Sequence, residues 1–303
     1  MNSLRISIVQ YLNTAPLVRG FTHGPLRGKY QLSFTVPSQC AEALRSGAVD
    51  IAIIPAIEFQ RIDNLVVLPN LSIASKKSVR SLLLVSKKPI HEVRRIALDR
   101  SSRSTQALVR ILCAKRWQIT PEFTESDPDL PAMLQQADAA LLIGDPALCL
   151  AFHSESVATR DATGDLTSPA AVSGLSASAP LLFYDIVEKW RALTSFPAVL
   201  ALWAARPGAD TPEVIRDFQD SLAFGQQHIQ EISADSSREL KLPAHKITRY
   251  LTENIDYTLD GENLLGLQRY YELAAELGLI KEARPLQIAG AEKSGELAAA
   301  RRS

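Results

Sequence analysis

The sequence predicts an α/β protein of two lobes with a ligand cleft between them, and three observations support this fold class. Short apolar runs alternate with amphipathic helical segments along the first half of the chain, as in βα units. The run DIAIIPA at 50–56 is typical of a strand buried on both faces of a sheet. The chain has 303 residues and is 46% hydrophobic, which is enough for two lobes of about 150 residues each.

The first lobe is expected to begin with two strands, each followed by polar residues. Residues 4–10 are predicted to form a strand that leads to Asn13. Residues 30–36 are predicted to form a second strand. A helix over 39–46 follows it, and Ser38 is the expected N-cap of that helix.

Within the second lobe, a new βα unit is expected to begin near residue 94. There RRIALD has the pattern of a strand, RSSRST at 100–105 that of a turn, and QALVRILCAKRW that of an amphipathic helix. A further buried strand leads to Asp145 and Pro146, which suit the first turn of another helix. Further along, Thr211 is the expected N-cap of a long helix that ends near residue 233.

The order of these units predicts two lobes that the chain crosses between twice. We place the first lobe at 1–86 plus 190–285 and the second at 87–189. Residues 286–303 have few large apolar side chains and are expected to be a mobile tail.

Composition excludes several classes of partner. Lys and Arg total 33 and so do Asp and Glu, so no basic field exists to attract nucleic acid or an acidic membrane. No apolar run of about 18 residues and no secretory leader pattern is visible, so cytoplasmic residence is expected. The three cysteines are isolated from one another and from histidine at ligand spacing, which predicts ordinary thiols and no metal site.

Four segments place small polar groups where a βα turn would open, which is where open α/β sheets bind ligands. They are YLNTAPL at 11–17, SVRSLLLVS at 78–86, RSSRST at 100–105 and LLIGDPAL at 141–148. Because the net charge is zero, any anion must be held by local donors. The sequence therefore predicts a cleft for a small anion.

Seven segments together resemble the chorismate dehydratase family of the futalosine route to menaquinone, in that family's order and spacing over about residues 1–280. They are QYLNTAPL, VPSQCAEALRSGAVDIAIIPAIEF, SVRSLLLVS, ALDRSSRSTQALVRIL, QQADAALLIGDPAL, FYDIVEKWRALTSFPAVLALWAAR and LLGLQRYYELAAELGL. The resemblance implies a type II periplasmic-binding-protein fold used by a cytoplasmic enzyme. It also implies the removal of water from chorismate, a dianionic ring acid, to give 3-[(1-carboxyvinyl)oxy]benzoate. No cofactor is implied, and the sequence has no G-x-G-x-x-G turn, P-loop or H-E-x-x-H helix.

By this resemblance Asn13 and Ser81 match the family's two most important polar side chains. Neither is a base near neutral pH, so we expect Asn13 to orient the substrate and Ser81 to contact the departing hydroxyl or the enolpyruvyl group. The alternative is purely structural, with Asn13 shaping a turn and Ser81 satisfying backbone groups.

The remaining candidates are expected to hold carboxylates. A helix N-terminus with nearby hydroxyl groups binds anions, which independently favours Ser102, Ser104 and Thr105, with the Arg103 guanidinium as a possible addition. Ordinary helix capping with Arg103 in solvent is the alternative. Further substrate-binding candidates are Ser38, Gly144 and Asp145.

The proton acceptor has three candidates. Asp145 and Glu58 are the carboxyl groups nearest to the matched motifs, although Asp145 can instead cap its helix. We favour the third, the enolpyruvyl carboxylate of the substrate, because no His, Lys or Cys lies inside the motifs that match.

The sequence departs from the family pattern where Lys77 and Ser78 replace a usual Gly-Pro pair, which affects the approach to Ser81. Two other functions stay open. One is a small-carboxylate binding protein or sensor of the same fold, and the other is a sister naphthoate synthase of the same route.

Overall fold

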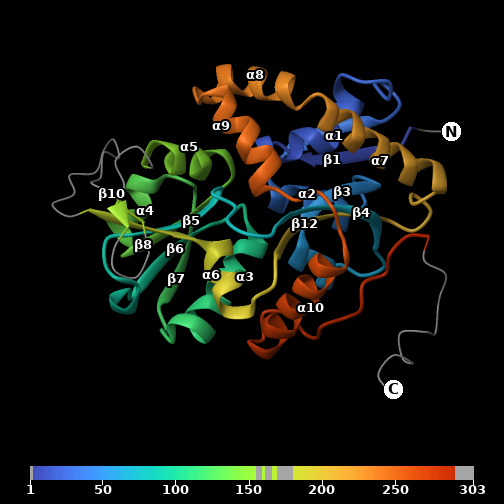
Figure 1. The fold of residues 1–303 in the computed structure, drawn as a ribbon. Helices are drawn as coiled ribbons and strands as arrows, with labels where there is room; N and C mark the ends of the chain where they lie inside the picture. Colours follow the sequence, from blue (N-terminus) through green and yellow to red (C-terminus); the bar gives the residue numbers. More distant parts are fainter. Residues whose placement is uncertain (1–2, 155–158, 161–165, 169–179, 291–303) are drawn as a thin grey trace.

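The computed structural model describes residues 3–154, 159–160, 166–168 and 180–290, which form two sheets side by side (Figure 1). Sheet A has the order β2-β1-β3-β12-β4, and β1, β2 and β3 are parallel while β12 is antiparallel to both neighbours. The strands of sheet A are β1 (Arg5–Val9), β2 (Gln31–Thr35), β3 (Ile51–Pro55), β4 (Val66–Ser75) and β12 (Ala198–Ala205).

Sheet B has the order β7-β6-β8-β5-β11-β10-β9, in which β6, β7 and β8 are parallel and β5 is antiparallel to β8 and β11. Its strands are β5 (Leu82–Ser86), β6 (Arg95–Asp99), β7 (Glu122–Ser126), β8 (Ala139–Ile143), β9 (Thr159–Arg160), β10 (Leu166–Ser168) and β11 (Leu181–Asp185). The two-lobed α/β fold expected from the sequence is therefore present.

Helices cover the sheets. The elements on and around sheet A are η1 (Leu12–Thr14), α1 (Ala15–Thr22), α2 (Pro37–Arg45), η2 (Ala56–Gln60), α7 (Pro212–Gln227), α8 (Ile229–Leu240), α9 (Ala244–Arg249), η5 (Tyr250–Asn254) and α10 (Gly261–Glu276). Those on and around sheet B are η3 (Ile90–Glu92), α3 (Arg103–Leu112), η4 (Cys113–Trp117), α4 (Leu130–Gln136), α5 (Gly144–Ser154) and α6 (Ile186–Thr194). No helix in the described part of the chain is long and apolar enough to cross a lipid bilayer.

Alternation along β5 shows how sheet B is covered on both faces. Leu83 and Val85 belong to a core shared with α4 and α5, whereas Leu82 and Leu84 face the larger core that includes α3, α6 and sheet A. Because successive side chains of a strand point to opposite faces, an apolar strand joins two cores at once.

The chain crosses between the sheets twice, through residues 76–81 and through α6. β5 lies wholly in sheet B, so the first crossing comes before residue 82, earlier than the expected lobe boundary after residue 86. The two crossings lie next to each other, and the side chain of Asp185 accepts hydrogen bonds from backbone amides of both.

Two expectations about the chain need correction. Ser38 is not the N-cap of α2, because Pro37 fixes the first helical position and Val36 is the capping residue. The mobile tail does not begin at residue 286, because the Ala289 amide donates to the Val67 carbonyl at 2.9 Å and the Val67 amide donates to Gln287 at 2.7 Å. Residues 291–303 lie outside the described residues.

Candidate functional site

A small pocket lies between the lobes, and polar groups from both of them line it. Its volume is about 50 Å³, well below the roughly 300 Å³ at the lower end of small-molecule sites. A ligand of ordinary small-molecule size could therefore enter only if the lobes part. The lining residues are Val9, Tyr11, Asn13, Pro37, Pro55, Ile73, Leu82, Ser102, Ser104, Thr105, Ile143, Gly144, Leu200 and Ala201.

Asn13 and Ser81 come together at the hydroxyl of Tyr250. Asn13 sits in the short helix η1 at the carboxyl end of β1, and Ser81 directly precedes β5. The Tyr250 hydroxyl donates to Ser81 Oγ at 2.8 Å and also contacts the Asn13 side chain. Ser81 and Tyr250 are each 1% exposed. Asn13 lines the pocket, whereas Ser81 and Tyr250 do not; Leu82, next to Ser81, does.

The hydroxyl turn at the start of α3 faces the pocket. Ser102 Oγ lies 2.7 Å from Thr105 Oγ1 and can donate to it, while Ser104 Oγ accepts from the Ile57 amide at 3.1 Å across the lobe boundary. The amide groups in the first turn of a helix have no intrahelical partners. In α3 no side chain caps them, so they remain available to an anion. Ser102, Ser104 and Thr105 all line the pocket.

A buried carboxyl group supports that turn. Asp99, at the end of β6, accepts from the amide of Ser101 at 2.9 Å and from its hydroxyl at 2.6 Å. Burial raises the pKa of Asp99, and the same cause raises the pKa of Tyr11, whose hydroxyl contacts Ser101. The turn is thus held between the end of β6 and the side chain of Tyr11.

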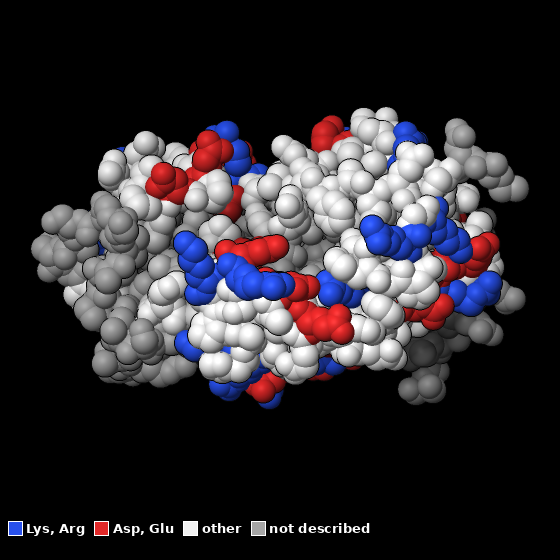
Figure 2. Space-filling model, turned by 90° about the horizontal axis from the view of Figure 1, so that it is seen from above, with Lys and Arg blue, Asp and Glu red and all other residues white. Residues whose placement is uncertain are grey.

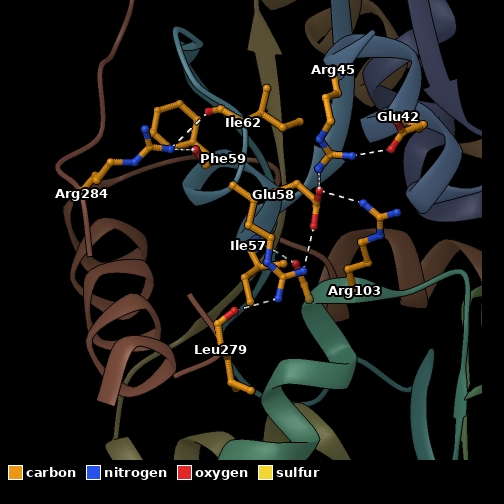
Figure 3. A network of polar contacts seen from close by, with 11 residues as sticks. Glu42, Arg45, Ile57, Glu58, Phe59, Ile62, Arg103, Leu279 and Arg284 are labelled. Atoms are coloured by element: carbon orange, nitrogen blue, oxygen red, sulfur yellow. Dashed lines mark hydrogen bonds and ion pairs between the residues drawn. The ribbon is translucent and has the colours of Figure 1, made fainter. Parts of the chain in front are cut away.

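The structure places Arg103 away from the pocket lining. Its Nη1 donates to Glu58 Oε2 at 2.9 Å, and Glu58 also pairs with Arg45 and Arg61 (Figure 3). Glu58 is fully buried and its carboxylate is engaged by three guanidinium groups. Glu58 and Arg103 therefore form an ion pair between the lobes, and neither is among the residues that line the pocket.

Ser38 is also absent from the lining, and its predicted role at a helix start is replaced by a backbone contact. Its amide donates to the Ser101 carbonyl at 3.1 Å, while the preceding Pro37 faces the pocket. Ser38 thus connects α2 to the hydroxyl turn of the other lobe.

Gly144 and Asp145 hold the start of α5 against the first lobe. Gly144 has φ +64°, and a Cβ there would lie 2.7 Å from the Tyr11 ring, so a larger residue would be strained in conformation and in space. Asp145 Oδ1 accepts from the Leu12 amide at 3.0 Å. Asp145 accordingly bonds across the lobe boundary instead of capping α5. Burial raises its pKa to about 6, an effect that the Leu12 hydrogen bond opposes.

The segment that carries Lys77 and Ser78 is fixed from two sides. Asn254 Nδ2 donates to the Ser78 carbonyl at 2.9 Å, and Asp185 Oδ2 accepts from the Arg80 amide at 2.7 Å. Arg80 has φ +60°, a conformation that costs free energy in a residue with a side chain. These contacts hold the backbone before Ser81 without the Gly-Pro pair.

Sequence reasoning missed Tyr250 and Asp185. Asp185 lies within the segment FYDIVEKWRALTSFPAVLALWAAR, but nothing in its spacing shows that it contacts residues 79 and 80. Tyr250 is 169 positions from Ser81, and a tyrosine in an amphipathic helical segment ordinarily indicates packing. A carboxylate directly before a helix, as at Asp185, was the one local signal present.

Charged side chains of both signs lie side by side on the face seen from above (Figure 2). That face shows no broad area of a single sign among the described residues. Charge over this face therefore gives no long-range attraction for an anion.

A family model and a known relative each match most of this chain. A family model described as menaquinone biosynthesis matches residues 4–276. The chorismate dehydratase of Thermus thermophilus is 26% identical over 272 residues, which is 88% of this chain and 93% of that one.

Solved structures share the fold. A protein of Archaeoglobus fulgidus has a TM-score of 0.69 at 19% identity, covering 92% of this chain and 98% of its own. The alkanesulfonate-binding protein SsuA of Xanthomonas axonopodis, bound to MOPS, has a TM-score of 0.58 at 15% identity and covers 95% of this chain and 96% of its own. These neighbours show the periplasmic-binding-protein fold that the sequence predicts.

Proposed function

Because this chain belongs to the menaquinone biosynthesis family, we propose that it removes water from chorismate to give 3-[(1-carboxyvinyl)oxy]benzoate. The observation that carries the proposal is the family match over residues 4–276. It is supported by the chorismate dehydratase relative, which covers most of both chains, and by a pocket between the lobes that carries uncharged donors.

The binding step would use the donors at the start of α3. One carboxylate of the substrate accepts hydrogen bonds from Ser104, from Thr105, whose hydroxyl accepts from Ser102, and from the amides of the first turn, where the helix dipole favours negative charge. Closure of the lobes then excludes water, which strengthens each of these hydrogen bonds. Arg103 contributes through its ion pair with Glu58, which joins the lobes.

The chemical step is an elimination. The C–H bond at C3 gives its electrons to the ring as the C–O bond at C4 breaks, and the proton and the hydroxide together leave as water. Ser81 donates to the departing hydroxyl and Asn13 orients the ring through its amide. The enolpyruvyl carboxylate of the substrate accepts the C3 proton and passes it to the departing hydroxide, so one water leaves and the carboxylate is restored. The protein supplies geometry and desolvation.

The test is to incubate the purified protein with chorismate and to follow the ultraviolet absorbance of the aromatic product, with mass spectrometry to establish the loss of one water. We expect wild-type turnover, and the Asn13→Ala and Ser81→Ala variants should bind chorismate but turn it over about a hundredfold more slowly. Chorismate that binds and stays unchanged would instead indicate a carboxylate-binding protein. Failure to bind would direct attention to the larger substrate of a naphthoate synthase.

A further inference from the structure

We propose that Tyr250 is a positioning residue for this elimination, because its hydroxyl directs the proton of Ser81 Oγ toward the departing hydroxyl. The inference rests on the proposed function and deepens it. Two contacts carry it, the 2.8 Å hydrogen bond from Tyr250 to Ser81 Oγ and the contact of Asn13 with the same hydroxyl. One phenol thus joins the two side chains that the reaction is expected to need.

One arrangement of the protons accounts for all of these contacts. Asn13 Oδ1 accepts from Thr14 Oγ1 at 3.4 Å, and in this arrangement the Asn13 amide nitrogen, which can only donate, donates to the Tyr250 oxygen. The single proton of Tyr250 is then donated to Ser81 Oγ. Ser81 keeps its own proton, and with substrate bound between parted lobes it can donate that proton to the departing hydroxyl.

Burial keeps Tyr250 neutral, so its effect passes through hydrogen bonding alone. Burial raises the pKa of its hydroxyl far above the ordinary value of 10.0, more than the hydrogen bonds to Ser81 and Asn13 lower it. A phenol with such a pKa is neither a base nor a proton donor to carbon at neutral pH. It fixes the orientation of its neighbours instead.

The local fold fixes where Tyr250 lies. It begins η5, a turn wider than an α-helix, which is often found at functional sites. Asn254 ends the same turn and donates to the Ser78 carbonyl at 2.9 Å. The turn therefore contacts the segment before β5 at both of its ends, and α9 descends from α8 toward the junction of the lobes (Figure 1).

The experiment compares Tyr250→Phe, Ser81→Ala and the double variant for kcat and KM with chorismate. Phenylalanine keeps the ring and removes only the hydroxyl. We expect Tyr250→Phe to lower kcat about tenfold to a hundredfold with KM within about threefold. If Tyr250 acts through Ser81, the same substitution in the Ser81→Ala protein should lower kcat less than about twofold.

Tyr257→Phe is the matched control, because Tyr257 is a buried tyrosine whose hydroxyl has no hydrogen-bond partner among the described residues. It should leave kcat unchanged, and thermal unfolding should show all single variants folded. A Tyr250→Phe enzyme as active as wild type, or effects of the two substitutions that simply multiply, would overturn the role of Tyr250 while leaving the proposed function intact. A wild-type protein that does not dehydrate chorismate would overturn both.

Discussion

Asp145 and Glu58, two buried carboxyl groups near the pocket, differ in the number of positively charged and hydrogen-bonding partners that they have. Asp145 has one amide donor and a pKa raised to about 6 by burial, with Glu239 adding to the effect. Glu58 instead meets three guanidinium groups. The sequence alone predicts both as candidate proton acceptors. It cannot separate them, because burial and ion pairing depend on residues far away in the chain. Burial raises the pKa of Asp185 to about 6 as well, but its carboxylate is bonded to backbone amides of the two crossing segments. Asp145, which follows the pocket-lining Gly144, is therefore the better candidate.

Asp145→Asn should keep at least about a tenth of the wild-type kcat if the substrate carboxylate accepts the proton, because the amide oxygen can still accept from the Leu12 amide. The measurement is the initial rate with saturating chorismate. Loss of all turnover in a folded variant would make Asp145 the base.

The same variant tests the pKa of Asp145 through stability. The folded pKa of about 6 lies above the ordinary 3.8, so the folded protein binds the proton more tightly than the unfolded chain. The stability that Asp145 contributes is complete below about pH 3.8 and is lost as the pH rises through about 6. Urea unfolding should show the stability of Asp145→Asn rising relative to wild type between pH 4.5 and pH 8, by about 2 kcal/mol. An equal difference at both pH values would contradict this.

Among the elements, those with local signals were predicted and those defined by tertiary contacts were not. The apolar strand at 50–56 is β3 to within a residue at each end, and Thr211 caps α7 through the Val214 amide at 3.3 Å. The helix expected to reach about residue 233 instead breaks at His228, whose Nδ1 lies 2.7 Å from the Phe224 carbonyl oxygen. Helical periodicity continues through that break, so no pattern in the sequence shows it.

Asp185 joins the two segments through which the chain crosses between the sheets. Asp185 Oδ2 accepts from the Val79 and Arg80 amides, and its Oδ1 accepts from the Val187 and Glu188 amides. Asp185→Ala leaves four amide groups without their acceptor and should lower the free energy of unfolding by about 3 kcal/mol.

Asp129→Ala is the comparison for that experiment, since Asp129 is an exposed N-cap that accepts from the Ala132 amide alone at 3.1 Å. It should cost only about 1 kcal/mol. Equal losses in urea unfolding would mean that Asp185 acts as an ordinary helix cap and does not join the crossings.

For the whole molecule, the contacts between the lobes hold a closed arrangement around a space too small for a ring acid. They include the Arg103–Glu58 ion pair and the Ile57–Ser104 and Leu12–Asp145 hydrogen bonds. The sequence predicted two lobes and polar turns facing one another, but the pairing of these residues follows from how the sheets sit, which no local pattern encodes.

Arg103→Gln and Glu58→Gln test whether Arg103 serves the closure or holds the substrate. If the ion pair only closes the lobes, Glu58→Gln should raise KM at least as much as Arg103→Gln, because it also removes the carboxylate partner of Arg45 and Arg61. Small-angle scattering should show both unliganded variants to be more expanded than wild type. A KM raised far more in Arg103→Gln than in Glu58→Gln would assign the guanidinium to the substrate.

The position of β12 has a consequence for biosynthesis. This strand lies between β3 and β4 in sheet A, yet it follows all of sheet B in the chain. As the polypeptide leaves the ribosome, β3 and β4 have no partner between them until residues 198–205 emerge, whereas every strand of sheet B is already synthesised. The amino-terminal lobe therefore completes last, and its two unpaired edges are the part of the nascent chain most open to wrong pairing and to chaperones.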